Sequence, residues 1–162
     1  MTAGHHPTAL TLAWAALAAL VLIAAASDMR QRRIPNRLVL LGAASAVAQQ
    51  ALLPAGLHPA SGLHPGTPGL AQGLLAAGLM LLISGGLWQL NLWGAGDAKW
   101  LTVLAAHSSP GLALLLLVLT LLCGGALALV WVALRLRGPM PYAVAIAAGE
   151  FALMLTLTRM PA

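Results

Sequence analysis

The chain has 162 residues, of which 60% are hydrophobic and only 7% are charged. A soluble domain carries about 25% charged residues, so this composition excludes an ordinary soluble globule and indicates a single integral-membrane domain over residues 1–162. The net charge of +5 comes from eight Lys and Arg against three acids, too sparse a set for a nucleic-acid-binding face. The single Cys excludes an internal disulfide and a multi-cysteine zinc site.

Nine of the eleven charged residues fall in three short segments, residues 28–37, 97–99 and 135–137. The first two segments are separated by 59 uncharged residues, and the last two by 35. A helix needs about 20 apolar residues to cross a bilayer. The first gap therefore predicts two spans, and the second predicts two shorter ones.

The apolar runs, punctuated by Pro, Gly and Ser clusters, predict an all-α polytopic membrane fold with six transmembrane helices. In chain order these helices cover residues 8–26, 38–53, 70–92, 97–107, 111–134 and 142–160. The fourth has only 11 residues and is the weakest. A five-span fold, in which this segment does not cross, is the alternative.

With six spans, all three charged segments lie on one membrane face, together with seven of the eight Lys and Arg. The positive-inside rule assigns this face to the cytoplasm and leaves the N-terminus outside. Arg30, Arg32 and Arg33 are then expected to orient the chain and to contact lipid headgroups.

Two of the three acids, Asp28 and Asp97, are expected at the same membrane boundary, one ending the first helix and one starting the fourth. Two carboxylates that share a site cannot both ionise cheaply, so such a pair holds a single proton. The ionised member takes a proton from a water that attacks a peptide carbonyl, while the protonated member donates to the carbonyl oxygen. This pair suffices for peptide hydrolysis.

The residues around Asp97 predict a loop suited to an extended peptide. Gly94 and Gly96 permit unusual backbone angles and close approach of a substrate chain. Lys99 and the helix N-terminus favour the ionised form of Asp97. The shared proton is therefore predicted on Asp28.

Other readings of these acids stay open. Each aspartate alone also fits an interfacial helix cap, and a small proton-coupled transporter uses acids within the membrane as well. Transporter acids are expected near the bilayer midplane, whereas Asp28 and Asp97 are expected at its boundary. A non-catalytic assembly factor is the third reading, although an inactive protein of this kind would be expected to lack one aspartate.

Two motifs resemble those of the type IV prepilin peptidases, membrane aspartic proteases of the Gly-x-Gly-Asp class. Asp28 is followed by Ile34-Pro35-Asn36, and residues 94–99 match the pattern Gly-x-Gly-Asp-x-Lys. Residues 140–147 also resemble the Pro-Tyr-x-x-Ala-Ile segment that opens the last span in short members. The order of spans and motifs is similar over most of the chain.

The resemblance implies that Asp28 and Asp97 are the catalytic residues. It implies further roles for six residues: Gly94, Gly96 and Lys99 in the active-site loop, and Ile34, Pro35 and Asn36 in a structural turn into the second helix. The implied activity is removal of the short basic leader of prepilin or pseudopilin substrates. The implied location is the cytoplasmic face of the bacterial inner membrane, in pilus assembly or secretion.

Larger members of that family carry paired Cys-x-x-Cys motifs in a cytoplasmic region between the first spans, and they also N-methylate the new terminus. Here the first inner connection is about ten residues long and lacks cysteine. This short form is similar to the peptidases of tight-adherence (Flp) pilus systems. It implies a peptidase without methyltransferase activity that needs no cofactor, neither S-adenosylmethionine nor zinc. The substrate's identity and the oligomeric state do not follow from the sequence.

Three further residues have weaker patterns. Glu150, eight residues into the last helix, is a candidate support for the active site, or else a hydrogen-bonded packing residue. His58 and His64 lie in a Pro-rich connection without a third ligand, which makes a poor metal site, so no metal is expected. His107 is expected to be an ordinary turn residue.

Overall fold

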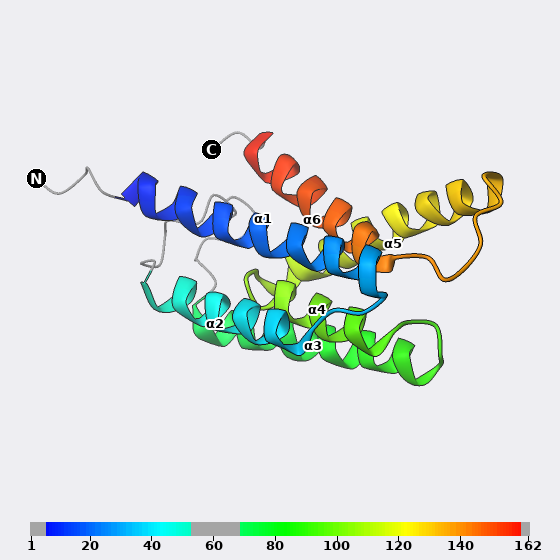
Figure 1. Ribbon diagram of the computed structural model, residues 1–162. Coiled ribbons are helices and arrows are strands. Elements are labelled where there is room, and N and C mark those ends of the chain that lie inside the picture. Colours follow the sequence, from blue (N-terminus) through cyan, green and yellow to red (C-terminus); the bar gives the residue numbers. More distant parts are fainter. Residues whose placement is uncertain (1–5, 53–68, 160–162) are drawn as a thin grey trace, which may run out of the picture.

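The computed structural model describes residues 6–52 and 69–159, and these residues form six α-helices and no strands (Figure 1). The predicted all-α fold is confirmed. The helices are α1 (His6–Gln31), α2 (Asn36–Leu52), α3 (Leu70–Gln89), α4 (Ala95–Ala105), α5 (Pro110–Ala133) and α6 (Tyr142–Arg159).

Helix α1 continues five residues past its predicted end at position 26 and so contains Asp28. The reason is local, because Met29, Arg30 and Gln31 are good helix formers and no Gly or Pro interrupts them. The helix ends where Arg32 takes a left-handed φ of 54° and its N–H donates to the Asp28 carbonyl at 2.9 Å. Asp28 is therefore held by helix geometry rather than by a loop.

Helix α3 ends three residues earlier than predicted, at Gln89. Asn91 adopts a left-handed φ of 57°, a conformation that asparagine tolerates well. The N–H groups of Asn91 and Leu92 bond back to the carbonyls of Trp88 and Leu87, which is the Schellman termination of a helix. Helix α5 ends in the same way, with Arg135 at φ 51°.

The connections α1–α2, α3–α4 and α5–α6 all lie at one end of the bundle, on the right in Figure 1. These connections hold or adjoin the three charged segments. The bundle thus gathers most of its charge at one end, as the even spacing of the spans predicted. The membrane side that this end faces stays a prediction.

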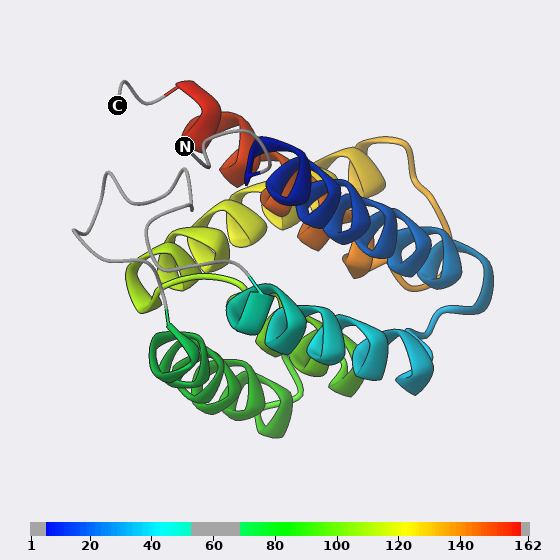
Figure 2. The ribbon, with the colours of Figure 1, turned by 90° about the vertical axis from the view of Figure 1, so that its left-hand side faces the viewer.

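Helices α1 and α6 lie side by side, and α5 packs against α6 (Figures 1 and 2). Helix α4 packs against α2 and α3, and its Trp100 is fully buried. A Cβ at Gly42 of α2 would lie 3.1 Å from the Trp100 ring, so glycine lets α2 approach this large side chain. The short α4 is therefore an internal element of the bundle.

Three helices are long and apolar enough to cross a membrane, as judged on the described residues: Leu12–Gln31, Leu70–Gln89 and Pro110–Ala133. A shorter apolar helix covers Tyr142–Leu157. Helix α4 has 11 residues, about 16 Å at 1.5 Å per residue, which is half of a hydrocarbon core. Six helices are thus confirmed, while six membrane crossings stay a prediction.

The packing of α5 on α6 gives a stability prediction. A Cβ at Gly149 would lie 2.8 Å from the Thr120 backbone nitrogen, so Gly149→Ala forces the two helices apart. We expect a loss of about 1–3 kcal/mol in the free energy of unfolding in detergent. Gly125→Ala is the control, because a Cβ there meets nothing within 4 Å. Equal stability of the two variants would contradict this close helix contact.

Candidate functional site

Asp28 is a buried acid that contacts the start of α6. Its side chain is only 7% exposed, and its Oδ2 accepts a hydrogen bond from the Ala143 N–H at 3.1 Å. The first N–H groups of a helix have no partner within the helix, and the helix dipole favours negative charge there. Asp28 of α1 therefore caps α6 across the bundle, and this contact fixes where α6 begins.

Asp97 lies in the first turn of α4, three residues after the N-cap residue Gly94. Its carboxylate accepts a hydrogen bond from the Gly94 backbone. In this arrangement the side chain of the third helical residue bonds to the N–H of the N-cap residue. A Cβ at position 94 would lie 2.8 Å from the Asp97 Oδ2. A larger residue at position 94 would therefore make the Asp97 carboxyl shift.

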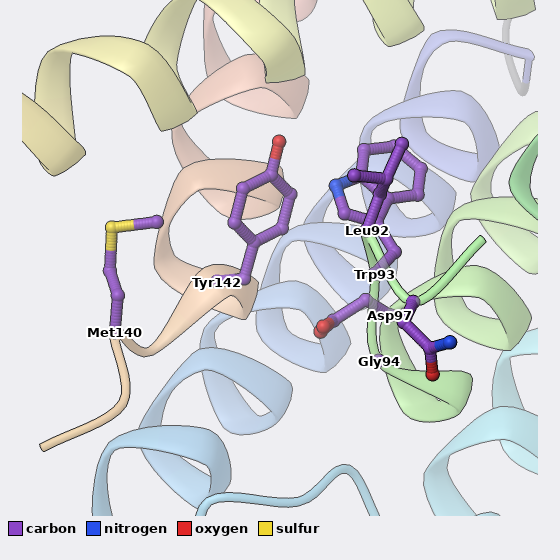
Figure 3. Close-up of a pocket in the computed structure, with 7 residues that line it drawn as sticks. Leu92, Trp93, Gly94, Asp97, Met140 and Tyr142 are labelled. Atoms are coloured by element: carbon purple, nitrogen blue, oxygen red, sulfur yellow. The ribbon is translucent and has the colours of Figure 1, made fainter. Parts of the chain in front are cut away.

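An open cavity of about 390 Å³ lies beside Asp97 (Figure 3). Its walls come from the α3–α4 connection, the start of α4 and the segment that leads into α6. The lining residues are Asn91, Leu92, Trp93, Gly94, Asp97, Met140 and Tyr142. Figure 3 shows Asp97 and Tyr142 approaching the cavity from opposite sides. Its size is in the range of binding pockets for small molecules or a few side chains.

The first two residues of α6 connect the two aspartates. Tyr142 lines the cavity with Asp97, and the next residue, Ala143, donates to Asp28. The Tyr142 ring also contacts Trp93, with ring centroids 5.4 Å apart and planes inclined by 54°. The start of α6 therefore contacts Asp28 directly and faces Asp97 across the cavity.

Asp97 has an altered acidity. Burial, and secondly the negative charge of Asp28, raise the pKa of Asp97 from 3.8 to about 6, although the hydrogen bond from Gly94 opposes the change. The sequence predicts that Lys99 and the helix N-terminus favour the ionised form of Asp97, whereas burial acts in the opposite direction and raises its proton affinity. A carboxyl with a pKa of about 6 is still mostly ionised at pH 7, and Lys99 is exposed. The negative charge of Asp28 thus acts on Asp97, so the two carboxylates lie within electrostatic range of each other.

The other predicted loop and turn residues lie close by. Gly96 packs against Ile34, since a Cβ there would be 3.6 Å from the Ile34 nitrogen, an ordinary contact. Ile34 is buried, and Pro35 directly precedes α2, where its carbonyl accepts the Leu38 N–H at 2.9 Å. Asn36 is the exposed first residue of that helix. Through these contacts the α1–α2 connection packs against the start of α4.

Glu150 lies apart from the cavity, eight residues along α6 from Tyr142, about 12 Å at 1.5 Å per residue. It is 4% exposed, and within the described part of the chain its Oε2 has no hydrogen-bond partner. His58 and His64 lie outside the described residues. His107 is buried, and its ring nitrogens contact the Ser45 Oγ at 2.8 Å and the Val103 carbonyl at 3.0 Å. It joins α2 to the end of α4, away from both aspartates.

Sequence reasoning did not assign Trp93, Met140, Tyr142 or Ala143 to the site. Two signals were present: Trp93 directly precedes the Gly-x-Gly-Asp motif, and Tyr142 opens the segment noted for its resemblance. The backbone donor of Ala143 carries no sequence signal, because any residue except proline supplies an N–H. Among residues 6–52 and 69–159, no three His, Cys, Asp or Glu side chains gather as a metal site would require.

Residues 15–129, well over half of the chain, match the type IV leader peptidase family. Both aspartates, Gly94 and Gly96 lie within this matched region, whereas Tyr142 and Glu150 lie beyond it. Comparisons with curated proteins and with solved structures gave no match.

The raised pKa of Asp97 predicts a pH-dependent stability. A group that binds its proton more tightly in the folded state stabilises the fold fully below its ordinary pKa of 3.8, and this contribution is lost as pH rises through about 6. We expect the unfolding temperature of detergent-solubilised protein to fall from pH 4 to pH 7, and Asp97→Asn to flatten that fall. An unchanged slope in the variant would contradict the assignment.

Proposed function

Because the chain belongs to the type IV leader peptidase family, we propose that it is a membrane aspartic endopeptidase that removes the basic leader of prepilin or pseudopilin substrates. The observation that supports this best is the convergence of Asp28 and Asp97 on the first turn of α6. Two carboxyl groups within electrostatic range, one of which lines an open cavity, are the groups that activated-water peptide hydrolysis requires.

The geometry suggests which acid does what. We assign the proton to Asp97, because burial and the negative charge of Asp28 raise its pKa, and we assign the base role to Asp28, whose Oδ2 accepts the Ala143 N–H. In the proposed first step, Asp28 takes a proton from water as the water oxygen bonds to the scissile carbonyl carbon. The Asp97 proton passes to the carbonyl oxygen. Because the acids are coupled, the single proton belongs to the pair.

In the second step the tetrahedral intermediate breaks its C–N bond. The leaving amine takes the proton held by Asp28, and a hydroxyl proton of the intermediate returns to Asp97. The products are a leader with a new carboxyl terminus and a mature chain with a new amine. Both aspartates regain their starting states, so no cofactor takes part.

We also propose that the protein lacks methyltransferase activity and acts at the cytoplasmic face of the inner membrane. Only residues 32–35 lie between α1 and α2, which leaves no room for a folded region in that connection. The gathering of charged segments at the aspartate end of the bundle supports a cytoplasmic site through the positive-inside rule. The short form agrees with the Flp pilus branch.

The first prediction concerns the two acids. Co-expressed with a prepilin, Asp28→Asn and Asp97→Asn are each expected to lower leader removal at least about a thousandfold, as loss of an essential acid or base does. The amide oxygen of Asn still accepts the N–H of Ala143 or Gly94, so the fold is retained. Gel mobility of the substrate is the measurement, at equal membrane levels of each variant.

Glu150→Gln is the matched acid-to-amide control, because Glu150 lies away from the cavity, and we expect it to keep leader removal within about threefold. Processing that survives in either aspartate variant would exclude the two-acid mechanism. Absence of processing by the wild type with several prepilins would favour a transporter or an assembly factor.

The glycine beside Asp97 gives a second prediction. Gly94→Ala displaces the Asp97 carboxyl, since the new methyl would lie 2.8 Å from Oδ2, and we expect about a tenfold or greater loss of leader removal. Gly96→Ala makes only ordinary contacts at 3.6 Å and is the control. Position 94 has φ −74° and ψ 145°, which alanine adopts freely. A loss of leader removal in Gly94→Ala would therefore result from displacement of the Asp97 carboxyl and not from backbone strain.

A further inference from the structure

Arg32, which sequence reasoning assigned to orientation and lipid headgroups, has specific contacts inside the protein. It is the first residue after α1, and its backbone N–H donates to the Asp28 carbonyl at 2.9 Å. Its guanidinium donates to the Pro139 carbonyl and lies over the Trp131 ring, 5.6 Å from the centroid. One arginine thus joins the Asp28 end of α1 to the α5–α6 connection.

Trp131 also bonds to the α5–α6 connection. The indole Nε1 donates to the Gly138 carbonyl at 3.2 Å, while the ring face receives Arg32. A guanidinium over an aromatic face is attracted by the negative face of the ring. Two neighbouring carbonyls, those of Gly138 and Pro139, are therefore fixed by side chains from α5 and from the end of α1.

The residues that directly follow Pro139 form part of the site. Met140 and Tyr142 line the cavity beside Asp97, and Ala143 donates to Asp28. Only three residues separate Pro139 from Ala143. A displacement of the Pro139 carbonyl therefore moves the first turn of α6 relative to both acids.

We propose that Arg32 is a positioning residue for the active site, whose guanidinium holds the α5–α6 connection so that the start of α6 stays against Asp28 and the cavity. The inference rests on the proposed function, and it adds a role that neither the aspartate motif nor the charge count contains. Arg32 lies outside the cavity lining and touches neither the Asp28 nor the Asp97 carboxylate in any contact described above.

The backbone of Arg32 supports a role for its side chain. At φ 54° an L-residue has a strained conformation that glycine adopts freely, which is why glycine commonly ends helices. Membrane orientation alone does not require an arginine at this strained position, because Arg30 and Arg33 already supply exposed charges beside it. The contacts with Pro139 and Trp131 are what an arginine adds here.

The test compares charge-matched variants in the co-expression assay. Arg32→Gln is expected to lower the rate of leader removal about tenfold or more, because small displacements of reacting groups have large effects on rate. Arg33→Gln removes the same charge from the same segment and is expected to stay within about twofold of wild type. Arg32→Lys keeps a donor and a cation over the ring, so it is expected to recover part of the rate.

Trp131→Leu separates positioning from membrane orientation, because it removes no charge. It is expected to lower the rate as Arg32→Gln does, and the double variant to be little worse than either single one, with a coupling equivalent to about tenfold in rate. Arg32→Gly removes the strain of the left-handed backbone conformation, so this variant is expected to fold normally. Its rate of leader removal is expected to stay low, because the guanidinium is absent.

Equal rates for Arg32→Gln and Arg33→Gln, or additive effects of Arg32→Gln and Trp131→Leu, would overturn the positioning role. Failure of the proposed function is distinguishable, since the wild type itself would then remove no leader.

Discussion

The hydrogen bond from the Ala143 N–H to the Asp28 carboxylate is the contact on which the site depends. The unpaired N–H groups at a helix start are unfavourable when buried, and so is a buried acid without a hydrogen-bond donor. Here the N–H of α6 donates to the acid, so one bond satisfies both groups. The bond places α6 against α1 and brings Tyr142 into the cavity of Asp97. Without it, the two aspartates would share a bundle end but have no common wall.

A membrane protein with three acids must confine them where charge is tolerated. The left-handed residues Arg32, Asn91 and Arg135 end α1, α3 and α5 at the same end of the bundle. The charged segments follow or adjoin those ends. Asp28 and Asp97 lie near this charged end of the bundle, whereas the third acid, Glu150, is buried farther along α6.

The start of α4 and the end of α1 contribute differently to the site. Gly94 lets the Asp97 carboxyl fold back on the N-terminus of α4, where burial and Asp28 keep its proton affinity high. Arg32 lies outside the cavity and connects the end of α1 to the segment that leads to Tyr142. Burial and Asp28 raise the pKa of Asp97, and we infer that Arg32 sets the alignment of α6.

The sequence by itself determined the helix count, the charged end and the two candidate acids, because apolar runs, breakers and sparse charges are local features. It also placed Gly94 and Gly96 beside Asp97, although only the structure separates the close contact of Gly94 from the ordinary packing of Gly96. The tertiary structure decided the direction of the Asp97 pKa, the part of Tyr142 and the contacts of Arg32. These depend on desolvation and on groups more than 40 residues away in the chain, which no local pattern records.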